Sequence, residues 1–233
     1  MFISYQEFEE NLSRVQASIL AAEQKSGRLA GSVRLLPVTK NPPVDAALYA
    51  FRSGLKSVGE NRVQEALSKM DDADSAMGWE LIGPLQSNKA KKVAECFDRV
   101  QSVDRAKVAK ALQRYASEAE RNLGVLLQIN AGADPNKSGA SLEEASALME
   151  CALGQSNLKI DGLMTIAPLD DDPAVARACF AALRKCRDRL EASFGVILPE
   201  LSMGMSGDME AAIQEGSTMV RVGTALYGKR DYA

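Results

Sequence analysis

Lys40 places a cationic amine at the end of a predicted buried strand, where a charged side chain is unusual. It follows the apolar and β-branched run 35–39, which predicts a strand buried on both faces, and Pro42 and Pro43 then prevent the strand from continuing. One interpretation is a rim lysine that reaches solvent and pairs with a carboxylate. The other is a partly desolvated amine whose pKa falls and which forms a Schiff base with a carbonyl. Lys40 alone does not decide between them.

Two turns near the end of the sequence are rich in glycine and hydroxyl side chains. Ser206 and Gly207 stand between a predicted strand and a predicted helix, and Gly223, Thr224 and Ala225 repeat that arrangement. Each turn alone is a simple helix cap or an anion site. Together they are typical of the phosphate site of a barrel. With Lys40 they favour a ligand that carries both an aldehyde and a phosphate, and pyridoxal 5′-phosphate (PLP) is such a molecule.

Arg221 lies within a predicted strand, between Val220 and Val222. Its guanidinium is always charged. One interpretation is a buried ion pair with a carboxylate on a neighbouring strand, and the other is a donor to the pyridine nitrogen of PLP. An arginine donor leaves that nitrogen unprotonated, so the ring is a weaker electron sink than it is beside an aspartate.

The sequence contains no histidine, which removes the Ser-His and Cys-His nucleophiles and the HExxH zinc site. The cysteines at 96, 151, 179 and 186 follow no zinc or redox spacing and are expected to be free thiols. No metal site is therefore predicted. Acid–base chemistry must come from lysine, tyrosine, cysteine, carboxylates or a cofactor.

The elements that must position these residues alternate between short apolar strands and helices. An amphipathic helix at about 5–26 comes first, and helical segments separate eight predicted strands. The strands are predicted at 33–39, 57–59, 79–83, 99–103, 124–130, 160–166, 200–205 and 219–223. Eight such alternations, without a GxGxxG turn after the first strand, predict a closed (β/α)8 TIM barrel with an extra N-terminal helix, in one domain over residues 1–233. In such a barrel the active-site groups lie at the C-terminal ends of the strands.

Charge and hydropathy give no sign of nucleic acid or membrane as partners. The net charge is −3 and the isoelectric point is near 5.3. The first residues carry acids where a signal peptide needs bases, and no apolar run is long enough for a membrane span. These features predict a cytoplasmic protein. No heptad or large apolar helix face argues against a monomer.

Several longer motifs resemble the YggS/PROSC family of PLP-binding homeostasis proteins over nearly the whole chain. The motifs are VTK at 38–40, GENRVQE at 59–65, WELIGPLQSNK at 79–89, SVDR at 102–105, GLMTIAP at 162–168, and LSMGMSGDMEAAIQEGSTMVRVGTALYGKRDY at 201–232. The resemblance implies the fold of the alanine racemase N-terminal domain, a fold-type III PLP barrel. It also implies that Lys40 carries PLP as an internal aldimine.

By the same resemblance the remaining site residues surround the cofactor. Asn61 would lie near it, Met205 would pack by the ring, and Arg221 would face the ring nitrogen. The phosphate would be held by Ser206, Gly223 and Thr224. One position departs from the family: a histidine is common in the third-strand motif, and this chain has Glu80 in WELIG. No catalytic role is assigned to Glu80.

Three functions from different classes fit these residues: a PLP carrier, a PLP-dependent amino-acid racemase, and a lysine-dependent aldolase acting on a sugar phosphate. A racemase needs a second base opposite the lysine, and the related racemase takes a tyrosine from a C-terminal β-domain that is not expected here. The common aldolase barrels place their lysine on a later strand. The sequence therefore predicts a PLP carrier without a dedicated catalytic residue. It would maintain vitamin B6 and amino- and keto-acid pools, with apo PLP-dependent enzymes as candidate transient partners.

Overall fold

A computed structural model describes residues 2–40 and 43–228 of the 233-residue chain. Pro42, one of the two prolines expected to stop the first strand, lies outside the described residues, as does the end of the expected 1–233 domain. All eight predicted strands are present and parallel in one sheet, in the order β1-β8-β7-β6-β5-β4-β3-β2. Their bounds are β1 Arg34–Pro37, β2 Ser57–Glu60, β3 Gly78–Leu81, β4 Arg99–Val103, β5 Leu123–Gln128, β6 Leu158–Met164, β7 Glu200–Ser202 and β8 Met219–Val222.

The two outer strands of that order, β1 and β2, bring the sheet almost to closure. They meet at an isolated parallel bridge between Val38 and Gly59, where the N–H of Thr39 donates to the carbonyl of Gly59 at 3.1 Å. The sheet is therefore a nearly closed barrel. The prediction of a (β/α)8 barrel with a leading helix is confirmed.

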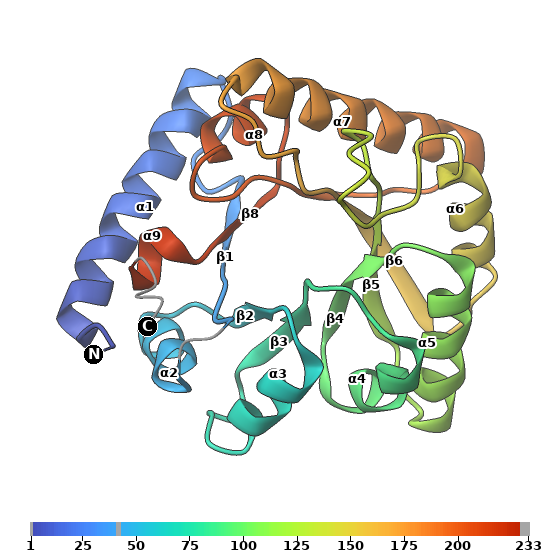
Figure 1. Ribbon diagram of the computed structural model, residues 1–233, viewed down its shortest axis with the longest axis horizontal. Helices are drawn as coiled ribbons and strands as arrows, with labels where there is room; N and C mark the ends of the chain where they lie inside the picture. Colours follow the sequence, from blue (N-terminus) through green and yellow to red (C-terminus); the bar gives the residue numbers. More distant parts are fainter. Residues whose placement is uncertain (1, 41–42, 229–233) are drawn as a thin grey trace.

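The helices form a ring around the strands (Figure 1). Their bounds are α1 Tyr5–Lys25, α2 Asp45–Arg52, α3 Val63–Met70, α4 Ala90–Cys96, α5 Ala106–Glu118, α6 Ala145–Leu153, α7 Pro173–Phe194, α8 Met209–Gln214 and α9 Thr224–Tyr227, with a 3₁₀ turn at Ser87–Lys89. Within the described ranges no helix is long and apolar enough to cross a bilayer.

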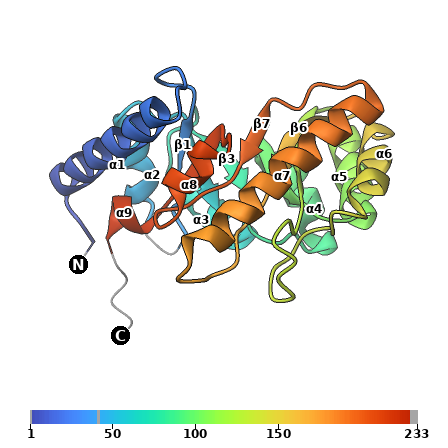
Figure 2. The same ribbon diagram turned by 90° about the horizontal axis from the view of Figure 1, so that it is seen from above.

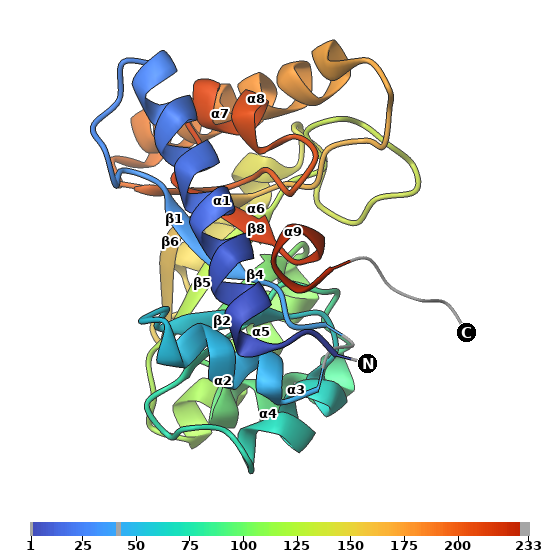
Figure 3. The ribbon, with the colours of Figure 1, turned by 90° about the vertical axis from the view of Figure 1, so that its left-hand side faces the viewer.

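The leading helix α1 begins at a capping box and packs through one apolar stripe. Ser4 accepts a hydrogen bond from the N–H of Glu7, and the Glu7 carboxylate accepts one from the N–H of Ser4. At helical spacing, Phe8, Leu12 and Ile19 are buried. Figure 3 shows α1 lying across the outside of the barrel with α8 and α9 against it. The helix therefore completes the ring beside β1 and β8.

The two ends of the barrel carry different loops. Figure 2 shows the loops that precede β1 and β7 along one edge and the loops that follow β5 and β6 along the other. Several strands end earlier than predicted: β1 ends at Pro37 rather than at 39, and β7 ends at Ser202 rather than at 205. Their last apolar residues leave the strand ladder because they turn into the loops at the C-terminal mouth.

The apolar core is divided by the sheet. Most buried apolar side chains form one cluster between the strands and the helix ring. A second, small cluster consists of Leu36, Val38, Ile82 and Met219. Since a Cβ at Gly59 would touch both Leu36 and Ile82, small residues on the inward face leave room for these larger ones.

Candidate functional site

Lys40 lies at the C-terminal mouth of the barrel, directly after β1. There β1 is flanked by β8 on one side and β2 on the other. The N–H of Val38 donates to the carbonyl of Val222 at 2.8 Å, and the next N–H donates to the carbonyl of Gly59 at 3.1 Å. The half-buried Lys40 is therefore held between the turn that starts at Gly223 and the turn that follows β2.

Asn61 is the first residue of the turn after β2 and is half-buried. The turn after β3 passes so close to it that a Cβ on Gly83 would overlap the Asn61 carbonyl. Glycine is required there because no other residue permits that approach. The structure thus brings Asn61 to the same side of the mouth as Lys40.

Ser206 links the turn after β7 to the turn after β8. Its Oγ accepts a hydrogen bond from the N–H of Ala225 at 3.4 Å. Helix α8 is preceded by Asp208, whose carboxylate accepts a bond from the N–H of Met205 at 2.6 Å. Ser206 is therefore not the cap of α8, and that interpretation of its hydroxyl is wrong. The turn itself needs Gly204, which has φ +94° and whose Cβ would lie 2.5 Å from the Cβ of Ala212.

The turn after β8 is narrow where it meets β1. A Cβ on Gly223 would stand 3.2 Å from the carbonyl oxygen of Val38, whereas a Cβ on Gly207 would meet nothing within 4 Å. Thr224 is exposed at the start of α9. The rim beside Lys40 is thus lined by backbone and hydroxyl groups, and it opens toward Gly207.

Arg221 points into the barrel, which settles the orientation that the sequence left open. Its Nη1 donates to Ser202 Oγ at 2.7 Å, and its Nη2 donates to the carbonyl of Thr165 at 2.8 Å. Ser202 in turn donates to Gln101 on β4, a strand that is not adjacent to β7, so this bond crosses the interior. Burial lowers the pKa of Arg221 to about 10, against the opposing effect of Asp208. Arg221 is therefore a desolvated guanidinium beneath the mouth.

The two methionines of the β7 segment occupy different environments. Met203 is fully buried in the core, whereas Met205 is 38% exposed in the turn at the mouth. Met205 is therefore available to a ligand, and Met203 is not.

A buried ion pair clamps the backbone next to Lys40. The Lys69 ammonium on α3 donates to the carbonyl of Thr39 at 2.6 Å and to the Glu60 carboxylate at 2.7 Å. The Thr39 hydroxyl donates to the same carboxylate oxygen at 2.6 Å. Burial raises the pKa of Glu60 despite these donors, and within the described residues its second oxygen has no hydrogen-bond partner. This clamp fixes the peptide group between Thr39 and Lys40 and ties β1 to β2 at the barrel seam.

Sequence reasoning missed the clamp and the polar interior. Gln101, Ser202 and Lys69 are not among the site residues predicted from the sequence. The available signal was the placement of polar residues at every second position of buried strands, as in RVQSV and ELSMGM, which predicts an inward polar face. Which polar residues bond to one another across the barrel could be identified only from the structure.

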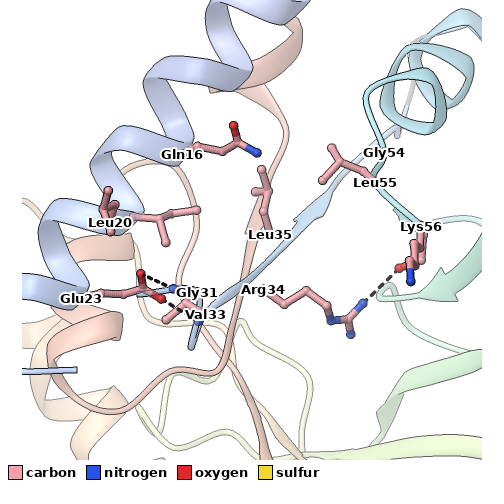
Figure 4. Close-up of a pocket in the computed structure, with 12 residues that line it drawn as sticks. Gln16, Leu20, Glu23, Gly31, Val33, Arg34, Leu35, Gly54, Leu55 and Lys56 are labelled. Atoms are coloured by element: carbon pink, nitrogen blue, oxygen red, sulfur yellow. Dashed lines mark hydrogen bonds between the residues drawn. The ribbon is translucent and has the colours of Figure 1, made fainter. Parts of the chain in front are cut away.

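A cavity of about 470 Å³ lies at the opposite, N-terminal end of the barrel. It lies between the second half of α1, the start of β1 and the segment from Gly54 to Ser57 that follows α2. Figure 4 shows Leu20 and Glu23 of α1 on one side of it and Leu55 and Lys56 on the other, with the Arg34 side chain directed away from α1. The Glu23 carboxylate accepts bonds from the loop before β1, and Arg34 pairs with Glu80 at 2.7 Å. Glu23 and Arg34 are therefore engaged in contacts that hold the fold together at this end of the barrel.

The groups at the mouth fit the chemistry of PLP. Lys40 supplies an amine, the paired turns supply hydroxyl and backbone donors, and Arg221 supplies a planar cation that a ring nitrogen can accept from. These three kinds of group are the ones that an aldehyde, a phosphate and a pyridine nitrogen would need.

Comparison with known proteins gives matches over almost the whole chain. The family described as "Alanine racemase, N-terminal domain" matches residues 3–231. The "Pyridoxal phosphate homeostasis protein" of Pseudomonas aeruginosa is 44% identical, with 96% of each chain covered. The protein of that name from Escherichia coli K12 is 38% identical, with 96% of this chain and 97% of its own covered.

Solved structures extend the comparison to the fold. PipY of Synechococcus elongatus, with PLP bound, has a TM-score of 0.83 at 36% identity and covers 95% of this chain and 100% of its own. An alanine racemase of Clostridium difficile has a TM-score of 0.78 at 15% identity, covering 97% of this chain but 57% of its own. The match to the alanine racemase shows the barrel fold alone.

Proposed function

The chain belongs to the family of pyridoxal phosphate homeostasis proteins, and we propose that it binds PLP covalently through the amine of Lys40. A relative whose structure contains PLP shares the barrel over its full length. The observation that carries the Lys40 assignment is its position between the turns after β8 and β2, with Arg221 beneath.

Each residue of the mouth has a part in holding the cofactor. PLP supplies an aldehyde, which combines with a lysine amine when water leaves. Ser206, Gly223 and Thr224 hold the phosphate through hydroxyl and backbone donors. Arg221 donates to the ring nitrogen, while Asn61 and Met205 line the ring. The clamp through Lys69 and Glu60 orients the backbone of Lys40.

The surroundings of Lys40 favour a carrier over a racemase. A racemase needs a second base on the opposite face of the cofactor. Among the described tyrosines, Tyr227 packs near the clamp, and its hydroxyl donates to the carbonyl of Ala46. Burial and the Glu60 charge raise the pKa of Tyr227 above its ordinary value, so it remains protonated near neutral pH. Tyr5 and Tyr49 stack with Phe2 and Phe8 on the outside of the barrel. The protein therefore holds and passes on PLP, and the vitamin B6 pool depends on it.

Spectroscopy and chemical trapping test the covalent link. Wild-type protein mixed with PLP should show a visible absorption band, and borohydride reduction followed by peptide mass mapping should place the modification on Lys40. Lys40→Ala should abolish both signals. Lys56→Ala is the matched control, because Lys56 is an exposed lysine at the other end of the barrel, and it should retain them. A reduced adduct on another lysine in wild-type protein would refute the assignment.

A second experiment separates a carrier from a racemase. The PLP-loaded protein is incubated with L-alanine, and D-alanine is measured by chiral chromatography. In parallel, the loaded protein is mixed with an apo PLP-dependent enzyme whose activity reports transfer. We expect transfer without D-alanine formation. Sustained D-alanine production that Lys40→Ala abolishes would establish the racemase instead.

A further inference from the structure

A continuous chain of buried hydrogen bonds runs from Arg221 across the barrel to Glu80. Arg221 Nη1 donates to Ser202 Oγ at 2.7 Å, and Ser202 Oγ donates to Gln101 Oε1 at 2.6 Å. Gln101 Nε2 then donates to Glu80 Oε2 at 2.7 Å. All four residues are at most 3% exposed. The chain links the floor of the proposed PLP site to the N-terminal end of the barrel.

The direction of every bond in this chain is fixed by its two ends. A guanidinium only donates and an ionised carboxylate only accepts. Ser202 must therefore accept from Arg221 and donate to Gln101, and the Gln101 amide must turn its NH₂ toward Glu80. No hydroxyl or amide in the chain can reverse without leaving a buried donor facing another donor, which is costly.

Glu80 is kept ionised at the far end of the chain. Burial acts to raise its pKa, but Arg34, Arg99 and the Gln101 amide together hold the pKa below its ordinary value. Arg34 Nη1 lies 2.7 Å from Glu80 Oε1, and Arg99 Nε lies 4.0 Å from Oε2. The carboxylate therefore polarises the chain toward itself, which makes the Ser202 oxygen a better acceptor for Arg221.

Arg221 needs such support because its own partners are neutral. Both Nη atoms donate to uncharged oxygens, those of Ser202 and of the Thr165 carbonyl. A guanidinium held this way can rotate away from a ligand unless its acceptors are themselves fixed. The relay, defined as Ser202, Gln101 and Glu80, fixes one of them.

We propose that Gln101 and Glu80 are positioning residues of the PLP site, which act through Ser202 to aim Arg221 at the ring nitrogen of the cofactor. The proposal rests on the proposed function, since it requires Arg221 to contact that nitrogen. It also assigns a role to Glu80, the buried carboxylate at the far end of the relay.

The test compares PLP with its 1-deaza analogue, in which a C–H group replaces the ring nitrogen. Dissociation constants for both ligands are measured by absorbance titration on wild type, Gln101→Met and Glu80→Gln. Methionine has a similar length to glutamine and cuts the relay without touching the ion pairs of Glu80. Wild type should prefer PLP, and Gln101→Met should weaken PLP binding about tenfold, as expected when a hydrogen bond to a charged group is lost, with deaza-PLP unchanged.

Gln128→Met is the matched control. Gln128 is also buried, at 3% exposure, but its amide donates to the carbonyl of Ser138 and not to the relay. It should leave the preference for PLP over deaza-PLP intact. Glu80→Gln should reduce that preference in the same direction as Gln101→Met, and thermal unfolding identifies the fraction of each variant that is folded.

The outcomes separate the two proposals. If wild type binds both ligands equally, Arg221 does not contact the ring nitrogen and that part of the proposed function fails. If wild type prefers PLP and Gln101→Met retains the full preference, the positioning role of the relay is refuted, but the contact between Arg221 and the ring nitrogen is not. An equal loss of affinity for both ligands in Gln101→Met would show a purely structural role and would also refute the positioning role.

Discussion

The strands β4, β5 and β6 and the strands β7, β8, β1 and β2 form two differently built parts of one barrel. β5 is paired with β6 along its whole length, from Leu123 to Gln128. Among the described residues, β7 and β8 are paired in register only at Ser202 and Met219, and β1 and β2 meet at one bridge. We call the first group the frame strands and the second the site strands.

Every predicted PLP-binding residue lies on or directly after a site strand. They are Lys40, Asn61, Met205, Ser206, Arg221, Gly223 and Thr224. Short strands release their chains early, so backbone N–H groups and hydroxyls become available at the mouth. Full pairing would have used those N–H groups in the ladder. The longest paired ladder therefore lies in the frame strands, whereas the predicted binding residues lie on or after the site strands.

Alanine substitution of one buried leucine in each group of strands should show the difference between the two groups most strongly. Leu163 on β6 and Leu36 on β1 are both fully buried, and Leu36 is the register partner of Arg221. Leu163→Ala and Leu36→Ala should each lower the free energy of unfolding by about 3 kcal/mol, because each leaves a cavity. Only Leu36→Ala should also weaken PLP binding. Urea denaturation and PLP titration measure the two effects, and an equal loss of PLP affinity in both variants would remove the distinction.

The Lys69 clamp should have the next largest effect, because it joins two site strands where the ladder is weakest. Lys69→Met removes the donor to Thr39 and Glu60 and should destabilise the protein by about 2 kcal/mol at pH 7.5. The loss stays moderate because Glu60 can take up a proton. Lys92→Met, at an exposed ion pair on α4, is the control and should change stability by less than about 0.5 kcal/mol.

The clamp also predicts the sign of a pH effect. Burial already raises the pKa of Glu60, and removing Lys69 raises it further. A carboxyl group with a raised pKa in the folded state destabilises the fold as pH rises through that pKa. Lys69→Met should therefore lose more stability relative to wild type at pH 7.5 than at pH 5. An equal difference at pH 5 and pH 7.5 would show that Glu60 stays ionised without its partner.

Much of this division could be predicted from the sequence, because its local signals were strong. Eight apolar strands between helices predicted the barrel, and Lys40, Ser206 and Thr224 were recognisable as residues at strand ends. Strand lengths were overestimated at β1 and β7, since apolar residues that turn into the mouth look the same in sequence as residues in the ladder. The periodicity of apolar residues indicates which side chains are buried, but it does not indicate which residues pair in the sheet.

The interior contacts could not be predicted, because they join residues far apart in the sequence. Ser202 and Gln101 are 101 positions apart, and their bond exists only once the barrel has closed. Likewise, Arg221 in a valine-rich strand was compatible with an inward or an outward orientation. The alternation of side chains along a strand gives two faces, and the sequence does not say which face is the interior.

Replacing Arg221 should change the free energy of unfolding by a smaller amount and in the opposite direction. Its pKa is lowered to about 10 because burial penalises the cation, so the fold carries this cost at neutral pH. Arg221→Met should therefore raise the free energy of unfolding by about 1 kcal/mol while weakening PLP binding by more than tenfold. Chemical denaturation without PLP and absorbance titration with PLP measure the two quantities. A clear loss of stability would make Arg221 a structural residue.

Ser206 should give the smallest change in stability and a selective change in binding. Its hydroxyl accepts one long bond, at 3.4 Å from the Ala225 N–H, so Ser206→Ala should alter the free energy of unfolding by less than about 0.5 kcal/mol. If the hydroxyl also donates to the phosphate, the same variant should weaken PLP binding about fivefold. Pyridoxal, which has the aldehyde and the ring but no phosphate, should bind wild type and variant equally.

Ser202→Ala gives the contrast within the same strand segment. Ser202 is fully buried and bonded to both Arg221 and Gln101, so its loss should affect PLP and pyridoxal alike, because both ligands contain the ring nitrogen. The two serines, four residues apart, then report opposite ends of the cofactor. Equal effects of Ser206→Ala on PLP and pyridoxal would place the phosphate elsewhere on the rim, with the turn at Gly223 and Thr224 as its remaining support.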